Sequence, residues 1–204
     1  GNINYTKILK HSSGFINLDG SVFYTYFTNK IIADFITDPN KIIYDNLSGY
    51  AISKGITLNT DFNFTNGLKI IAGTTLMDVF DIDKDANGKK IKTPQLFAPK
   101  FSGTFAVSYT LPVSKIVFDF TGKVTGPMNL PVVPNDFRPA QSPLYTIANL
   151  QITKSITNGL EFYGGVKNIF NFLPKNPLLH PDDPFDKKGG KYFDINGVAR
   201  PDTN

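Results

Sequence analysis

The chain has 204 residues and is rich in aromatic side chains, with 18 Phe and 9 Tyr, but it has no Cys and no Trp. The absence of Cys excludes disulfides, thiolate metal sites and cysteine nucleophiles. The 21 Lys and Arg against 17 Asp and Glu leave a net charge of only +4. The positive residues are scattered, apart from one local concentration at Lys84, Lys89, Lys90 and Lys92 that is interleaved with Asp83 and Asp85, so we expect no nucleic-acid partner. A composition poor in Glu and Met and rich in Phe, Tyr, Thr and Ile predicts an all-β fold.

Apolar and polar residues alternate along most of the chain, which is the pattern of a strand with one apolar and one polar face. The pattern predicts about eight strands, over Ile3–Leu9, Phe15–Ile36, Ser53–Phe64, Leu68–Ile82, Phe97–Leu111, Ile116–Thr125, Leu144–Ile156 and Leu160–Phe170. Most are longer than the roughly 5–6 residues usual in soluble proteins and reach the ~9–11 that cross a bilayer at a tilt. No apolar run approaches the ~20 residues of a spanning helix.

The predicted connections alternate in length. Tight turns are expected at Asn66-Gly67, at 112–115 and at Asn158-Gly159. Longer links are expected around 37–41, 83–96 and 128–143, and after Asn171. Short turns on one side and long loops on the other are typical of an antiparallel outer-membrane β-barrel, with the short turns in the periplasm and the long loops outside the cell.

Charge along the apolar face supports the same interpretation. Lys54 and Asp78 each lie ten residues from the strand ends that flank the Asn66-Gly67 turn, where a lipid-facing band of about 25 Å would end. Lys154 is an exception near its turn, tolerable if its side chain snorkels to the interface. Aromatic residues cluster near the tight turns on this face, and they are Phe62, Phe64, Tyr109, Phe118, Phe120 and Phe162. A soluble sandwich with a Phe-rich core is the alternative, but the opposite face is rich in Asn, Thr, Ser and Gly, as suits a wet lumen.

Three segments carry a family resemblance: DGSVFYTYFTNKI from Asp19, SPLYTIANLQITK from Ser142 and GVKNIFNF from Gly165. Together they resemble the last part of the barrel of TonB-dependent outer-membrane receptors, especially those of Bacteroidetes. The resemblance implies that residues 1–204 are a C-terminal segment of a barrel of roughly 22 strands, with the plug domain and the closing strand absent from the chain. It also implies outer-membrane lipid and the TonB complex as partners, the latter through the absent N-terminal plug.

The function implied by the resemblance is active uptake of a scarce nutrient such as an iron-siderophore or cobalamin. Two other interpretations fit the residues. Eight strands also close a small barrel, so the chain can be read as a complete outer-membrane barrel with a structural or adhesion role. A soluble β-barrel binding module is the third possibility.

No catalytic constellation or cofactor motif stands out, so we expect no enzyme activity and no cofactor. The segment Asp83-x-Asp85-x-Asn87-Gly88 matches the first half of an EF-hand calcium loop. Pro94 replaces the bidentate Glu at the twelfth position. A hairpin loop tipped by Asn87-Gly88 is therefore favoured over a calcium or other metal site.

By resemblance, ligand contacts would come from the outer loops and the upper lumen. The candidates are Tyr44, Phe80, Phe97, Phe137, Arg138 and His180. Arg138 is a lone cation in a Pro-rich loop, suited either to an anionic ligand or to a hydrogen bond that anchors the loop. His180 lies in a Pro- and Asp-rich loop, where a solvated side chain is favoured over a ligand of a metal.

Overall fold

The computed structural model describes residues 1–34, 43–84, 88–131, 139–157 and 159–174. The strands are β1 (Asn2–His11), β2 (Gly14–Phe27), β3 (Ile31–Asp34), β4 (Ile43–Asn46), β5 (Tyr50–Phe64), β6 (Leu68–Lys84), β7 (Lys90–Pro94), β8 (Phe101–Leu111), β9 (Ile116–Thr125), β10 (Tyr145–Thr157) and β11 (Leu160–Val166). Among these residues no helix is long and apolar enough to cross a membrane. The predicted all-β fold is confirmed.

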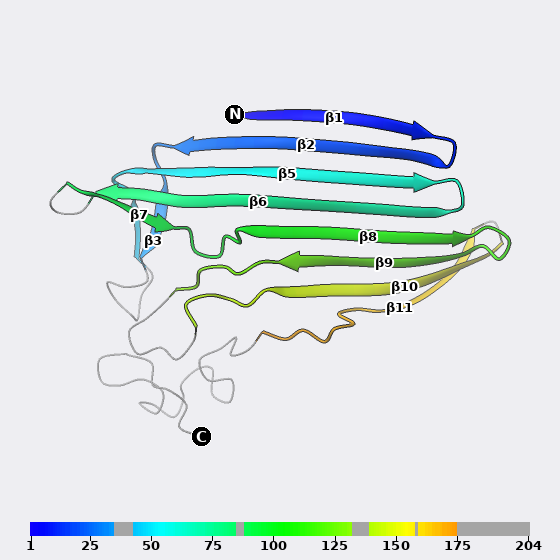
Figure 1. Cartoon of the computed structure of the whole chain (residues 1–204). Helices are drawn as coiled ribbons and strands as arrows, with labels where there is room; N and C mark the ends of the chain where they lie inside the picture. Colours follow the sequence, from blue (N-terminus) through cyan, green and yellow to red (C-terminus); the bar gives the residue numbers. More distant parts are fainter. Residues whose placement is uncertain (35–42, 85–87, 132–138, 158, 175–204) are drawn as a thin grey trace, which may run out of the picture.

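One large antiparallel sheet forms a single curved layer in the order β1-β2-β5-β6-β8-β9-β10-β11, with β7 paired to β6 (Figure 1). Four hairpins, β1-β2, β5-β6, β8-β9 and β10-β11, turn at one end of this sheet. We call it the turn end. The longer connections lie at the opposite end, which we call the loop end. The predicted alternation of short and long connections is confirmed.

The sheet does not close on itself. Within the described residues β1 pairs only with β2, and β11 pairs only with β10. A complete eight-stranded barrel requires β1 to pair with β11, and this pairing is absent from the described sheet. Two strand edges therefore carry backbone groups without a neighbour on one side.

Continuous registers separate the side chains into two faces, because directly paired residues point to the same side of a sheet. The apolar face is formed by Ile3, Tyr5, Leu9, Ile16, Val22, Ile56, Leu58, Phe62, Ile70, Leu76, Phe105, Val107, Tyr109, Phe118, Phe120, Leu150, Ile152 and Phe162. The polar face is formed by Asn4, Thr6, Asn17, Asp19, Ser21, Thr57, Asn59, Asp61, Asn63, Thr75, Thr104, Ser108, Asp119, Thr121, Asn149, Gln151 and Thr153.

The layer has almost no core of its own. The buried apolar residues in the described part of the chain are only Leu47, Ala51, Phe80 and Ala148. Large apolar side chains such as Ile56 (56% exposed) and Leu58 (47% exposed) project from the apolar face. This arrangement excludes the soluble sandwich with a Phe-rich core, because the aromatic residues are not packed between two sheets.

Two predicted strands extend too far along the chain. The predicted strand Phe15–Ile36 ends at Phe27, and the chain then forms β3, which pairs with β4 in a separate two-stranded sheet. The predicted strand Leu160–Phe170 ends at Val166. Polar runs interrupt the alternation at both places, Thr28-Asn29-Lys30 after Phe27 and Lys167-Asn168 after Val166, and the predicted strands extended past these interruptions.

The predicted strand Phe97–Leu111 begins only at Phe101. Residue Phe97 adopts a positive φ of 58°, which removes it from the extended region. Strands β7 and β8 pair in turn with the two parts of the same edge of β6, first at Phe80↔Pro94 and then at Leu76↔Phe101. Gln95 and Lys100 still bond to the β6 backbone, and residues 96–99 between them leave the sheet. Half of the predicted loop 83–96 is thus a hairpin extension of β6.

Candidate functional site

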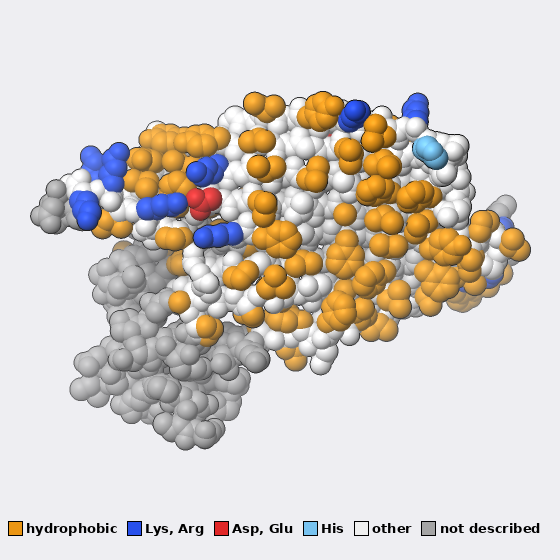
Figure 2. Space-filling model, in the orientation of Figure 1, with side chains coloured by type: hydrophobic (Ala, Val, Ile, Leu, Met, Phe, Trp, Pro, Cys, Tyr) orange, Lys and Arg blue, Asp and Glu red, His pale blue; other side chains and the backbone are white. Residues whose placement is uncertain are grey.

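The apolar face carries a band of mostly uncharged side chains that ends at the loop end. Lys54 and Asp78, which the sequence places at the edge of the band, are directly paired across β5 and β6. Beyond them, Lys92 lies 3.2 Å from the Asp78 carboxylate. Figure 2 shows apolar side chains spread over this face, with basic side chains gathered at the loop end. The predicted limit of the band is confirmed.

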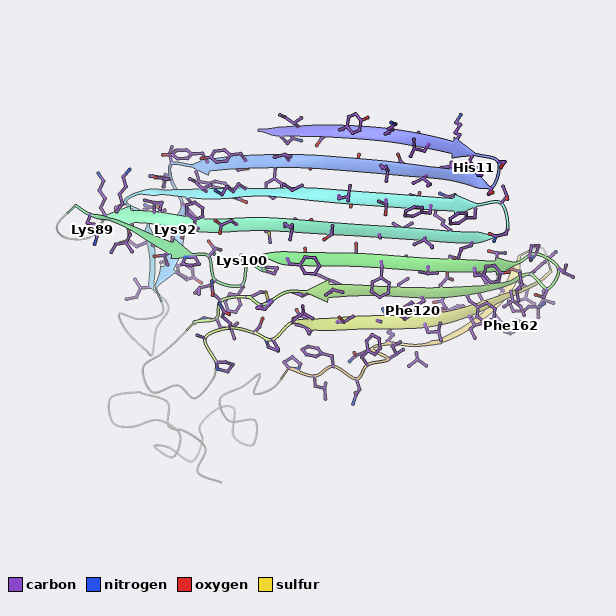
Figure 3. The ribbon with its side chains drawn as sticks, viewed as in Figure 1. His11, Lys89, Lys92, Lys100, Phe120 and Phe162 are labelled. Carbon is purple, nitrogen blue, oxygen red and sulfur yellow. The ribbon has the colours of Figure 1, made fainter. Side chains whose placement is uncertain are left out.

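Aromatic side chains mark the other limit of the band. Phe162 and Phe120 lie toward the turn end in Figure 3, and Lys92 and Lys100 lie toward the loop end. Phe62 and Phe64 stack with ring centroids 6.5 Å apart on β5, close to its turn. A row of aromatic residues at this level is typical of a membrane interface.

Two lysines, Lys154 and Lys7, lie within the band, and only Lys154 was expected there from the sequence. Lys154 donates a hydrogen bond from its Nζ to the backbone oxygen of Ser114 in the β8-β9 turn. The Lys154 ammonium therefore reaches the turn end, as snorkelling to an interface at that level requires. Lys7 also belongs to the apolar face, because it pairs with Leu18. Lys7 was not predicted on this face, although its odd-numbered position among Ile3, Tyr5 and Leu9 was the available signal.

Many side chains on the polar face hydrogen-bond to one another. Thr6 donates a hydrogen bond of 2.8 Å to Asp19, and Asn63 donates one of 2.6 Å to Asp61. The hydroxyls of Thr57 and Thr75 are 3.1 Å apart. Such side chains are suited to a hydrated interior or to a polar partner that occupies it.

A polar cluster anchors the β2-to-β5 connection on the polar face at the loop end. The ammonium of Lys30, just before β3, lies 2.7 Å from Asp81 on β6 and also bonds Gln95. Ser48, just before β5, donates to the carboxylate of Asp83. The sequence analysis did not find this cluster, because Lys30 lay inside a predicted continuous strand and its partners are 51 and 65 residues away.

The structure places three of the predicted ligand residues, and no ring contact joins them. Tyr44 is 68% exposed on β4, and Phe97 is 56% exposed ahead of β8, its backbone N–H bonded to Asn129. Phe80 is 7% exposed on the apolar face, so its ring points away from the lumen side. The other three candidates, Phe137, Arg138 and His180, lie outside the described residues.

The calcium motif is only partly described, because Asp85 and Asn87 fall outside the described residues. Asp83 uses its carboxylate to accept hydrogen bonds from Ser48 and from the Lys84 backbone. Strands β6 and β7 pair at Lys84↔Lys90, and Gly88 has a positive φ of 76°. The two strands that flank the tip are therefore paired, as the favoured prediction of a hairpin requires.

Two of the segments that carry the family resemblance are locked together. Asn149 on β10 accepts a hydrogen bond of 3.0 Å from the Asn168 backbone, and the Ile169 N–H bonds the Ala148 carbonyl at 2.8 Å. The Asn168 side chain makes two further bonds to the backbone of Phe172, at 2.9 and 3.0 Å. These contacts fold the chain after β11 back onto β10.

We expect Asn168→Ala to loosen the segment after β11 while the sheet remains folded. The substitution removes both bonds to Phe172, and it places Ala at a φ of 51° that favours Asn. The expected loss is about 1–3 kcal/mol of local stability, measured as faster hydrogen exchange at residues 168–172. The control Asn171→Ala also replaces a positive-φ Asn, but no side-chain bond to Asn171 is found within the described residues. Equal exchange in both variants would contradict the role of Asn168.

Comparison with known proteins agrees with this geometry. The family model described as TonB dependent receptor-like, beta-barrel, matches residues 5–169. The chain therefore belongs to the TonB-dependent receptor β-barrel family. No curated protein matches the chain.

Solved structures show the same fold at low sequence identity. The ferric-catecholate import receptor Fiu from E. coli K12 matches with a TM-score of 0.62 and 18% identity, over 84% of this chain and 23% of that one. The ferripyoverdine receptor of Pseudomonas aeruginosa matches with a TM-score of 0.60 and 19% identity, over 87% of this chain and 24% of that one. The copper transporter OprC matches with a TM-score of 0.59 and 14% identity, over 85% and 26%. The chain thus spans about a quarter of the length of these structures.

Proposed function

We propose that this chain is a C-terminal part of the barrel wall of a Bacteroidetes-type TonB-dependent receptor in the outer membrane. The observation that carries the proposal is the family match over residues 5–169, on a sheet with one apolar and one polar face. The apolar face meets lipid, and the polar face lines the lumen in which a plug domain would sit. The plug would contact the TonB complex.

The transported ligand in this proposal is an iron-siderophore, cobalamin or another scarce nutrient. Iron chelates are the first choice, because similar structures include a ferric-catecholate import receptor and a ferripyoverdine receptor. Because a copper transporter is also structurally similar, copper is tested as an alternative ligand. Ligand contacts are proposed for the exposed aromatic rings of Tyr44 and Phe97, and for Phe137, Arg138 and His180. Phe80 is the weakest candidate because its ring lies on the apolar face.

Uptake by the native bacterium tests the proposal. A strain lacking the gene is grown under iron limitation with a panel of ferric siderophores, and separately with limiting cobalamin or copper. We expect this strain to lose growth and labelled-metal uptake with one ligand. The intact gene should restore both, and inactivation of TonB should abolish both. Unchanged uptake of every ligand, or absence of the protein from purified outer membranes, would overturn the proposal.

A further inference from the structure

Five lysines gather at the loop end of the apolar face. The strand registers place four of them on this face. Lys54 pairs with Tyr24, Lys84 pairs with Lys90, and Lys92 pairs with Ile82. Lys100, just before β8, lines a hollow together with Lys54. We call these five residues the lysine patch, and Figure 2 shows basic side chains gathered in this region of the face.

The lysine patch is poorly neutralised. Asp78 is the acidic residue on this part of the face, and it pairs with Lys92 at 3.2 Å, with side chains 37% and 52% exposed. Lys54, Lys84, Lys90 and Lys100 make no ion pair with a described residue. The patch and Asp78 together carry a net charge of +4, which equals the net charge of the whole chain.

Aromatic rings support the ammonium groups. The Lys92 Nζ lies 3.8 Å from the centroid of the Phe80 ring, and the Lys54 Nζ lies 5.8 Å from the same centroid. Lys90 lies 5.8 Å from the Tyr50 ring, which stacks on Tyr26 at 5.0 Å. Cation–π contacts of this kind restrain long flexible side chains and leave the charge available to a second partner.

The hollow beside the patch continues into the apolar band. It is open, with a volume of about 490 Å³, and its lining combines apolar side chains with charged ones. Val22, Ile56 and Leu76 form its apolar side, and its charged side has two lysines, Lys54 and Lys100, against one carboxylate, Asp78. A ligand that fits both sides has hydrocarbon chains joined to an anionic head.

We propose that the lysine patch binds the phosphate groups of an outer-leaflet glycolipid, whose acyl chains lie along the apolar band. This proposal rests on the proposed outer-membrane location, in which the loop end faces the outside of the cell. The membrane location explains why the lysines lie on the apolar face, where a free anion from the lumen does not reach them. Each lysine near an anionic lipid surface adds to the attraction, so several acting together retain a lipid.

Lipid retention by the intact protein, purified from outer membranes in mild detergent, tests the proposal. The probes are diphosphorylated lipid A and the same lipid A after removal of its phosphates, with binding measured by native mass spectrometry. The patch variant combines Lys54→Gln, Lys92→Gln and Lys100→Gln. The control variant combines Lys10→Gln, Lys69→Gln and Lys115→Gln, which removes the same charge from three exposed lysines near the turn end.

We expect the patch variant to bind phosphorylated lipid A at least roughly tenfold more weakly than the unmodified protein. The control variant should bind phosphorylated lipid A as tightly as the unmodified protein does. Removing the phosphates from lipid A should weaken its binding to the unmodified protein as much as the patch substitutions do. Unchanged binding by the patch variant, an equal loss in the control variant, or equal competition by phosphatidylglycerol would overturn the proposal. These results leave the uptake function standing, whereas absence of the protein from the outer membrane overturns both proposals.

Discussion

Replacing Leu58 by Arg will destabilise the folded barrel by about 2–4 kcal/mol, the cost of a basic residue near the bilayer midplane on the lipid face. Leu58 pairs with Gly20 and Thr74 on the apolar face and is 47% exposed. It lies between the aromatic residues of the turn end and the Lys54–Asp78 pair. The Arg side chain is too far from either edge of the band to reach water without distorting the bilayer.

The matched control is Asn59→Arg, one residue away on the polar face, where Asn59 pairs with Asp19. We expect this variant to fold nearly as well as the unmodified protein, because a lumen accepts charge. Urea unfolding of the protein in lipid vesicles, followed by gel mobility with and without heating, measures both variants. If the two arginines cost the same, the assignment of the apolar face to lipid is wrong.

The second large effect concerns the open edge of β1. Gly1 and Tyr24 exchange both backbone hydrogen bonds, at 2.7 and 2.9 Å. Bonded and non-bonded pairs alternate along an antiparallel ladder, so the backbone groups of the even-numbered residues of β1 point away from β2. A strand edge exposed to lipid costs several kcal/mol for each unsatisfied group. We therefore expect another strand to pair with this edge in the membrane.

On this basis Asn4→Pro should sharply lower the amount of folded barrel. Proline removes an N–H that points away from β2 and blocks the approach of a neighbouring strand, while the β1-β2 ladder keeps its bonds. Asn4→Ala is the control, since it removes only the side chain and its 3.4 Å contact with Asn2. The readout is the heat-modifiable fraction in outer membranes. Equal folding of the two variants would show that no strand pairs with this edge of β1.

The site was only partly predictable. The charges that end the apolar band were correctly placed from sequence, because a strand rises by a constant amount per residue and each turn fixes the starting point. The Lys30–Asp81 pair was not predicted, and the sequence showed only the part of the lysine patch that lies within residues 84–92. Both combine residues from different strands and connections, and only the strand order brings Lys100 next to Lys54.

The strand ends were also only partly predictable. Alternation was sufficient to place β5, β6 and β9 within a few residues, because each of them has a partner along almost its whole length. Alternation failed after Phe27 and before Phe101, where the chain changes or loses its partner. A local pattern records which face a side chain prefers, but it does not record which strand lies beside it.

The sequence by itself determined that the protein is all-β, that each long strand has one apolar and one polar face, and that short turns alternate with long connections. These properties follow from local rules of period and turn chemistry. Only the tertiary structure decided that the described residues form an open layer with almost no core, that β7 and β8 share one edge of β6, and that Lys54 and Lys100 lie beside the lysines of β6 and β7 at the loop end. The physical reason is that pairing and clustering depend on residues far apart in the chain, whose approach is fixed by hydrogen-bond register and not by the local sequence.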